Sequence, residues 1–199
     1  MIFGLFLSVH ILNTIMAVIS PKNYDIFQEF VSGYYQLPLA ELSLLLSLVV
    51  HVVSAVYLFF VSPSLSRSLR SVLHRITGFI LLFLIGGHVL FTRILPYLNG
   101  INVGFDGVAY TLHSKFNLFF PYYLIYVSSG LYHLLNGFFV SLGGPSALVG
   151  PTNKVFWITF LILEAAAIGG LLGMAGFLYP IGDVDSSAYA QLQKRLALF

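Results

Sequence analysis

The hydrophobic positions of this chain fall into five long runs, a pattern that predicts a membrane protein. A helix that crosses the hydrocarbon layer needs about 20 mainly apolar residues. The runs of that kind are residues 2–19, 37–61, 76–98, 118–140 and 155–179. We therefore expect an all-α integral membrane fold with five transmembrane helices. Four of them would form a histidine-bearing bundle, and the fifth, rich in glycine, would stand beside it.

The polar segments between these runs are short and carry the Pro, Gly, Ser and Asn residues typical of turns. None is long enough to form a catalytic domain. In the tail, Ser186 or Ser187 is a plausible cap for a short amphipathic helix at the membrane interface. The expected organisation is a five-helix transmembrane domain at 1–182, made of two weakly related hairpins at 1–62 and 71–143 and a fifth span at 153–180, followed by an interfacial tail at 183–199.

Composition supports the membrane assignment and limits the available chemistry. Of the 199 residues, 58% are hydrophobic and only 8% are charged, whereas a soluble domain carries roughly 25% charged residues. Cysteine is absent, which excludes disulfides, thiolate-held iron–sulfur clusters and c-type haem attachment. The first residues lack the basic leader of a signal peptide and the pattern of a transit peptide, so the chain is expected to begin directly in the membrane.

The positions of the charged residues predict the orientation. Arg67, Arg70, Arg75 and Lys154 lie on the side of the second and fourth connections, where no acidic residue opposes them. The other side mixes both signs and is nearly neutral. Because basic connections stay inside, we expect the N-terminus and these two connections on the matrix or cytoplasmic side, and the C-terminus outside. The charged residues on the nearly neutral side are Lys22, Arg93, Lys115, Lys194 and Arg195 together with Asp25, Glu29, Asp106, Asp183 and Asp185.

Four histidines lie inside predicted spans, one in each of the first four: His10, His51, His88 and His133. An ionisable side chain in a bilayer is costly unless it is paired or ligated, and it usually marks function. A single histidine is equally well explained as a hydrogen bond between helices. Four in consecutive helices indicate more than that. His74 lies at a helix mouth.

A weak internal repeat adds to this pattern, because the segment after His10 resembles that after His88, and the segment after His51 resembles that after His133. Two histidines on neighbouring helices can supply both axial ligands of a b-type haem. We predict one haem b, its iron held by His51 and His133, with a second at His10 and His88 as the less favoured addition. Histidines that are only structural remain the alternative. The rings available to line such a site are Tyr57, Phe59, Phe83, Phe91, Tyr126 and Tyr132.

The segment Ser71-Val-Leu-His74-Arg75-Ile-Thr-Gly78 is the most specific local motif. Ser71 and Arg75 are four residues apart and share a helix face. A guanidinium there can pair with a haem propionate or hydrogen-bond to a quinone carbonyl. The alternative is a snorkelling anchor at the membrane surface.

This motif closely resembles the S-x-x-H-R-x-[ST]-G signature of the succinate dehydrogenase cytochrome b subunit. The resemblance implies that Ser71 and Arg75 line a ubiquinone pocket and that His74 lies near a haem propionate. Tyr132-His133-Leu-Leu-Asn136-Gly137 resembles the first half of that family's H-x-x-x-G-I-R-H motif, whose first histidine is the haem ligand. Phe139 and Val140 stand where that motif has Arg and His.

The whole chain also resembles a five-helix mitochondrial family of fungi that is linked to lipid homeostasis and distantly related to the complex II anchors. The residues that carry this likeness are His10-Ile-Leu-Asn13-Thr14, Tyr35-Gln36-x-Pro38, His51 and Gly87-His88-x-x-x-x-Arg93-x-x-Pro96. The five-helix dihaem cytochrome of bacterial fumarate reductases is similar in plan, though not in motif.

These resemblances imply a non-catalytic membrane anchor subunit of a mitochondrial complex II-type respiratory complex, in the inner membrane, with ubiquinone as substrate. Flavoprotein and iron–sulfur subunits, other membrane subunits and lipids would be its partners, and no nucleic acid is expected. The alternative is a mitochondrial protein, in the inner or outer membrane, that serves as an accessory respiratory subunit or in lipid homeostasis, with haem optional.

Two features of the fifth span complete the prediction. Glu164 lies in its middle, where a carboxyl group should be protonated, hydrogen-bonded or part of a proton path. The small residues that follow it favour close packing on another helix or chain. They are Gly169, Gly170, Gly173 and Gly176.

Overall fold

The computed structural model describes residues 2–61, 68–144 and 150–196, and in this part of the chain the regular structure is helical throughout. The elements are α1 (Ile2–Met16), α2 (Pro21–Tyr35), α3 (Pro38–Val61), α4 (Leu69–Val89), the π-helix η1 (Leu90–Ile94), α5 (Leu95–Leu98), α6 (Phe105–Ser114), α7 (Phe116–Gly143), α8 (Gly150–Met174), the 3₁₀ helix η3 (Val184–Ser186) and α9 (Ala188–Arg195).

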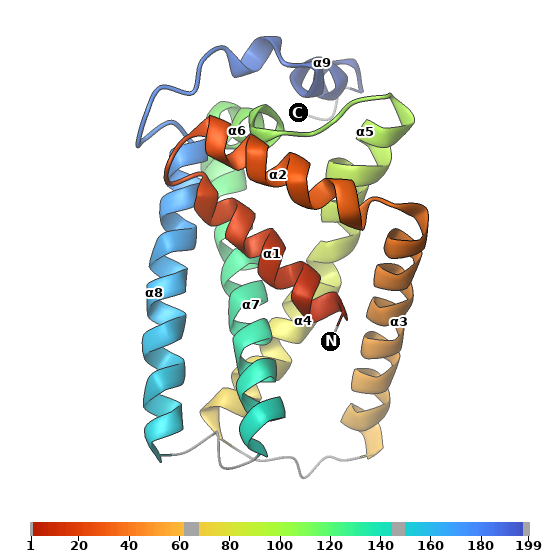
Figure 1. Ribbon diagram of the computed structural model, residues 1–199, viewed down its shortest axis with the longest axis vertical. Coiled ribbons are helices and arrows are strands. Elements are labelled where there is room, and N and C mark those ends of the chain that lie inside the picture. Colours follow the sequence, from red (N-terminus) through yellow and green to blue (C-terminus); the bar gives the residue numbers. More distant parts are fainter. Residues whose placement is uncertain (1, 62–67, 145–149, 197–199) are drawn as a thin grey trace.

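Four long rods define the molecule: α3, α7, α8, and the continuous run formed by α4, η1 and α5 (Figure 1). By length and composition, three of them can cross a membrane, namely Pro38–Val61, Leu69–Leu98 and Thr152–Met174. The 28-residue α7 is long enough but carries Ser128, Ser129, His133 and Asn136 among its apolar residues. With 15 residues, α1 is shorter than the roughly 20 needed. The prediction of five spans is thus confirmed for three helices and stays a prediction for α1 and α7.

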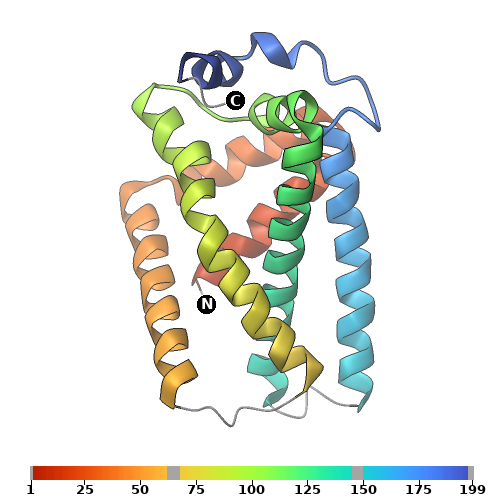
Figure 2. The same cartoon turned by 180° about the vertical axis from the view of Figure 1, so that it is seen from behind.

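The connections at one end of the rods are helices, so the prediction that they are simple turns was wrong. Helix α2 lies across this end of the bundle, and α6 and α9 lie beside it (Figures 1 and 2). Ser20 caps α2 by accepting a hydrogen bond from the Asn23 amide at 3.1 Å, and Pro21 suits the first turn. Short helices of this kind are stable mainly through tertiary packing, which the sequence pattern does not reveal.

Helix α6 begins with a cap supplied by a different helix. The amide of Phe105 donates to Oδ1 of Asp25, on α2, at 2.7 Å. Gly104 precedes it, and a Cβ at that position would lie 2.7 Å from the same carboxylate oxygen. Glycine is therefore required where α2 approaches the start of α6.

The end of the chain folds over the same layer. The Ala190 amide donates to Oγ of Ser187 at 3.1 Å, which confirms one of the two predicted caps of the interfacial helix α9. Tyr189 packs with Tyr24, Phe105 and Tyr110 in a core beneath it. Residues 62–67 and 145–149 lie outside the described residues; they include Arg67 and parts of the predicted second and fourth connections.

The glycine face of α8 packs on α1, as predicted for a run of small residues. A Cβ at Gly170 would clash with the backbone carbonyl of Thr14, and one at Gly173 with that of Ala17. The hydroxyl of Tyr179 donates to the Ala17 carbonyl. Helix α8 ends at Met174 rather than at 179, because Gly176 adopts a φ of 85° that an α-helix cannot continue through.

Candidate functional site

The four histidines of the predicted spans lie in two pairs, each joining two helices. The rings of His51 on α3 and His133 on α7 have centroids 5.9 Å apart at an interplanar angle of 90°. Those of His10 on α1 and His88 on α4 are 5.7 Å apart at 77°. The pairs are the ones that the internal repeat predicts.

These separations fit a metal held between two imidazoles. A metal–nitrogen bond is about 2 Å long and the imidazole centre lies roughly 1 Å beyond its nitrogen, so rings that share a metal have centroids about 6 Å apart. Among the described residues, His, Asp and Glu form no cluster of three or more that would hold a bare metal ion. Two imidazoles are enough to hold a haem, since the porphyrin provides four more nitrogens.

The orientation of His133 is also suited to ligation. Its Nδ1 donates to the backbone carbonyl of His74 at 3.1 Å, which leaves the lone pair on Nε2. A metal-binding histidine commonly has its second nitrogen fixed in this way. Gly78 makes room for the ring, because a Cβ there would lie 3.1 Å from its Cε1. The chemistry of this donor set therefore fits an axial haem ligand.

His51 has the opposite environment, since it is exposed on a helix without a single buried residue. An imidazole at the depth of an apolar helix is costly without a partner. A haem between α3 and α7 would cover this ring and the apolar side chains around it.

The second pair is enclosed by aromatic rings. His10 stacks on Phe6 at 5.6 Å, and His88 lies 4.8 Å from Tyr126. Of the rings predicted to line a site, Tyr126 thus contacts a histidine. Tyr132 packs on Phe156 with ring centroids 5.4 Å apart, and its hydroxyl donates to the Arg70 carbonyl.

At the start of α4, Ser71 and Arg75 are half-buried and share one face. The Ser71 hydroxyl lies 3.0 Å from that of Ser68, the residue that caps the helix. His74, in the same turn, stacks on His133 with centroids 3.9 Å apart. The predicted quinone residues and the His51–His133 pair are therefore joined through His74.

Arg70 differs from its sequence interpretation as a loop charge. Only 2% of its surface is exposed. Its Nε donates to Oδ1 of Asn136 at 2.9 Å, and its guanidinium lies 3.7 Å from the centre of the Phe156 ring. It thus ties α4 to α7 and α8. Asn136, a polar residue one turn beyond His133, is the sequence signal that could have indicated a buried hydrogen-bond partner for Arg70.

Glu164, in the middle of α8, accepts a hydrogen bond from the Ser128 hydroxyl of α7. Its second oxygen, Oε2, is buried without a hydrogen-bond partner. A hydrogen-bonded structural group, as predicted, describes this residue.

Comparison with known proteins finds a matching family model and a similar curated protein. The model of the family "Succinate dehydrogenase/Fumarate reductase transmembrane subunit" matches residues 64–142, which hold His74, His88 and His133. The "Succinate dehydrogenase cytochrome b558 subunit" of Bacillus subtilis (strain 168) is 28% identical over 183 residues, covering 87% of this chain and 89% of the relative. The chain is thus similar to the succinate dehydrogenase cytochrome b superfamily, over residues 64–142 in the family model and over most of its length in this relative.

The similarity is to a membrane subunit of the succinate dehydrogenase type. The match includes the Ser71–Gly78 motif and both helices, α4 and α7, that meet at His133. The described helices that can span a membrane agree with an integral membrane protein. No solved structure matches the chain.

Proposed function

We propose that this protein is the haem b-binding membrane anchor of a mitochondrial succinate dehydrogenase-type complex, where it contributes to ubiquinone binding and electron transfer. The observation that carries the proposal is the pairing of four histidines from four helices at the separation that axial ligation needs. The pair formed by His51 and His133 is the primary site. His10 and His88 would hold a second haem.

The residues of the chain have distinct tasks in this proposal. His51 and His133 would bind the haem iron. The carbonyl of His74 orients His133 through a hydrogen bond. Bound haem supplies a one-electron carrier between the soluble subunits and the quinone. Ser71 and Arg75 present a hydroxyl and a guanidinium to a quinone carbonyl at the end of the bundle, and the adjoining bilayer accepts the apolar tail.

Partners follow from what the chain lacks. It has no cysteine for an iron–sulfur cluster, so we propose that flavoprotein and iron–sulfur subunits dock on the side where α4 begins. The bacterial relative is named as a succinate dehydrogenase subunit, whereas the mitochondrial inner membrane rests on the resemblance to the fungal family.

The deciding experiment is purification of the native complex, with identification of its subunits and haem quantitation by the pyridine haemochrome method. We expect stoichiometric flavoprotein and iron–sulfur subunits and at least one b-type haem per chain. Purification without those subunits would favour the alternative, an accessory respiratory subunit or a protein of lipid homeostasis. Recovery from a bacterial plasma membrane or the mitochondrial outer membrane would overturn the location.

A further inference from the structure

Helix α3 carries His51, yet its own packing holds it weakly. None of its residues is buried, and it is apolar along its whole length. Among the described helices it packs mainly on α1 and α2, and in Figure 1 it stands apart from α7. Something other than core packing must set the position of His51 relative to His133.

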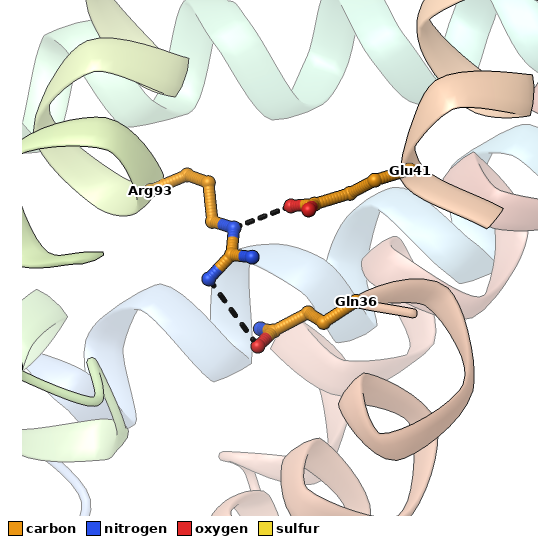
Figure 3. A network of polar contacts seen from close by, with 3 residues as sticks. All are labelled: Gln36, Glu41 and Arg93. Atoms are coloured by element: carbon orange, nitrogen blue, oxygen red, sulfur yellow. Dashed lines mark hydrogen bonds and ion pairs between the residues drawn. The ribbon is translucent and has the colours of Figure 1, made fainter. Parts of the chain in front are cut away.

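A polar contact at the start of α3 provides such a restraint. Nε of Arg93 donates to Oε1 of Glu41, in the first turn of α3, at 2.5 Å. Its Nη1 reaches Oε1 of Gln36, at the α2–α3 junction, at 3.4 Å (Figure 3). The guanidinium also lies 4.8 Å from the centre of the Tyr97 ring. Arg93 and Glu41 are both partly buried, so solvent screens this pair less than an exposed one.

The π-helix η1 places Arg93 for this contact. The Leu95 amide donates to the Leu90 carbonyl, five residues back, which widens this turn. Pro96 follows, and it has no amide hydrogen to continue an ordinary α-helix. Arg93 lies within this π turn, and His88 lies in α4 just before it. Within this short stretch, His88 contacts His10 of α1 and Arg93 contacts Glu41 of α3.

The other end of α3 is also tied to α4. The rings of Phe59 and Phe79 have centroids 5.7 Å apart and are perpendicular. His51 lies between these two contacts. An edge-to-face aromatic contact tolerates a range of centroid distances, whereas the guanidinium–carboxylate hydrogen bond restrains the two helices more closely.

We propose that Arg93 and Glu41 are a positioning pair that holds α3 at the separation and rotation at which His51 faces His133. The expected effect on haem affinity rests on the proposed haem function, whereas the restraint on α3 rests on the contacts of that helix. Neither residue touches a histidine of that pair, so both act through the helix.

The test measures the helix and the haem separately. In the full chain, which has no native cysteine, spin labels are placed on cysteines at the exposed positions Phe60 of α3 and Leu142 of α7. Pulsed electron paramagnetic resonance then gives the distance distribution between the helices. The variants are Glu41→Gln, Arg93→Gln and the charge swap Glu41→Arg with Arg93→Glu. Glu29→Gln, an exposed carboxylate of α2, is the matched control.

We expect each single substitution to broaden the distribution, the swap to narrow it again, and the control to leave it unchanged. Without the labels, the haem affinity of the His51–His133 site should fall about tenfold in Glu41→Gln, the lower range for residues that orient metal ligands. The swap should restore it.

An unchanged distribution in both single variants would overturn the positioning pair, as would a swap that restores neither reading. If the distribution broadens but no variant, the parent chain included, binds haem, the proposed haem function fails while the restraint on α3 stands. The two failures are therefore distinguishable.

Discussion

The imidazole rings of His74 and His133 are stacked, with centroids 3.9 Å apart and an angle of 9° between their planes. The His74 carbonyl accepts the hydrogen bond from Nδ1 of His133 as well. One residue of α4 therefore restrains the imidazole of α7 both by its ring and by its backbone. Because a metal binds in the plane of an imidazole, a ring that lies flat on His133 supports this ligand and does not oppose it across an iron.

The stacking predicts different outcomes for two substitutions of His74. His74→Phe keeps a flat ring against His133 and should retain haem. His74→Ala removes the ring and lets His133 rotate, so haem affinity should fall about tenfold. Both variants keep the backbone carbonyl, so the comparison isolates the ring. Haem titration of the apoprotein measures the difference, and equal affinities would show that stacking is irrelevant.

The two histidine pairs predict separable losses of haem. His133→Ala should abolish the b-type absorption of the haem at the His51–His133 site. His88→Ala should abolish only the absorption of the haem at the His10–His88 site. The pyridine haemochrome content should fall by one haem per chain in each single variant if both sites are filled. If His133→Ala left the full b-type spectrum, the primary site would be assigned wrongly.

Arg75→Lys tests the quinone site. Lysine keeps the charge but loses the planar fork of donors, so the KM for quinone should rise and the rate of quinone reduction should fall. The haem spectrum should not change. Lys154→Arg, at an exposed position on the same side, is the control. Unchanged quinone kinetics in Arg75→Lys would leave Arg75 as a propionate partner or a membrane anchor.

Asp25 predicts a pH dependence of stability. Burial raises the pKa of this carboxyl above its usual range; the hydrogen bond from the Phe105 amide opposes the shift, and Asp106 and Glu29 add to it. The folded chain therefore binds more protons here than the unfolded chain. The contribution of Asp25 to stability is greatest below its usual pKa and falls as the pH rises through the raised pKa.

Two substitutions of Asp25 separate its charge from its cap. Asp25→Asn keeps an acceptor for Phe105 but cannot ionise, so its thermal unfolding in detergent should change less between about pH 4 and about pH 7 than that of the parent. Asp25→Ala also loses the cap and should be less stable than Asp25→Asn by about 1 kcal/mol at every pH. Identical pH profiles for the parent and Asp25→Asn would contradict this assignment.

The orientation predicts that the connection at 62–71, with the densest unopposed positive charge, faces the matrix or cytoplasm. A protease site placed there should be cut only from that side, in mitoplasts opened by sonication or in inverted vesicles. One placed in the tail after α9 should be cut from the opposite side. Cleavage of the 62–71 segment from outside would reverse the topology.

The sequence by itself determined the long apolar helices and the candidate histidines that they carry. Long apolar runs have few alternatives to a helix in a membrane, so α3 and α7 begin and end within a few residues of the prediction. A histidine within such a run indicates a partner or a ligand, because an unpaired ionisable side chain costs free energy in a bilayer. The repeat even indicated which helices would bring their histidines together, and ligation by those histidines stays a prediction. The glycine residues of the fifth span also predicted close packing on another helix or chain, because small side chains let two helices approach each other.

Only the tertiary structure decided how polar residues are used. Arg70 and Arg75 stand in the same positive segment, and nothing in the local sequence says that Arg70 is buried between Asn136 and Phe156. Glu41 and Arg93 are 52 positions apart, and their contact depends on a π turn and on how α3 is placed. Short polar segments became α2 and α6 because other elements pack on them, and α6 is also capped by Asp25 of α2. Apolar periodicity is a local property that the bilayer enforces, whereas a polar side chain is satisfied by whichever partner the fold brings within reach, and that partner is a property of the whole chain.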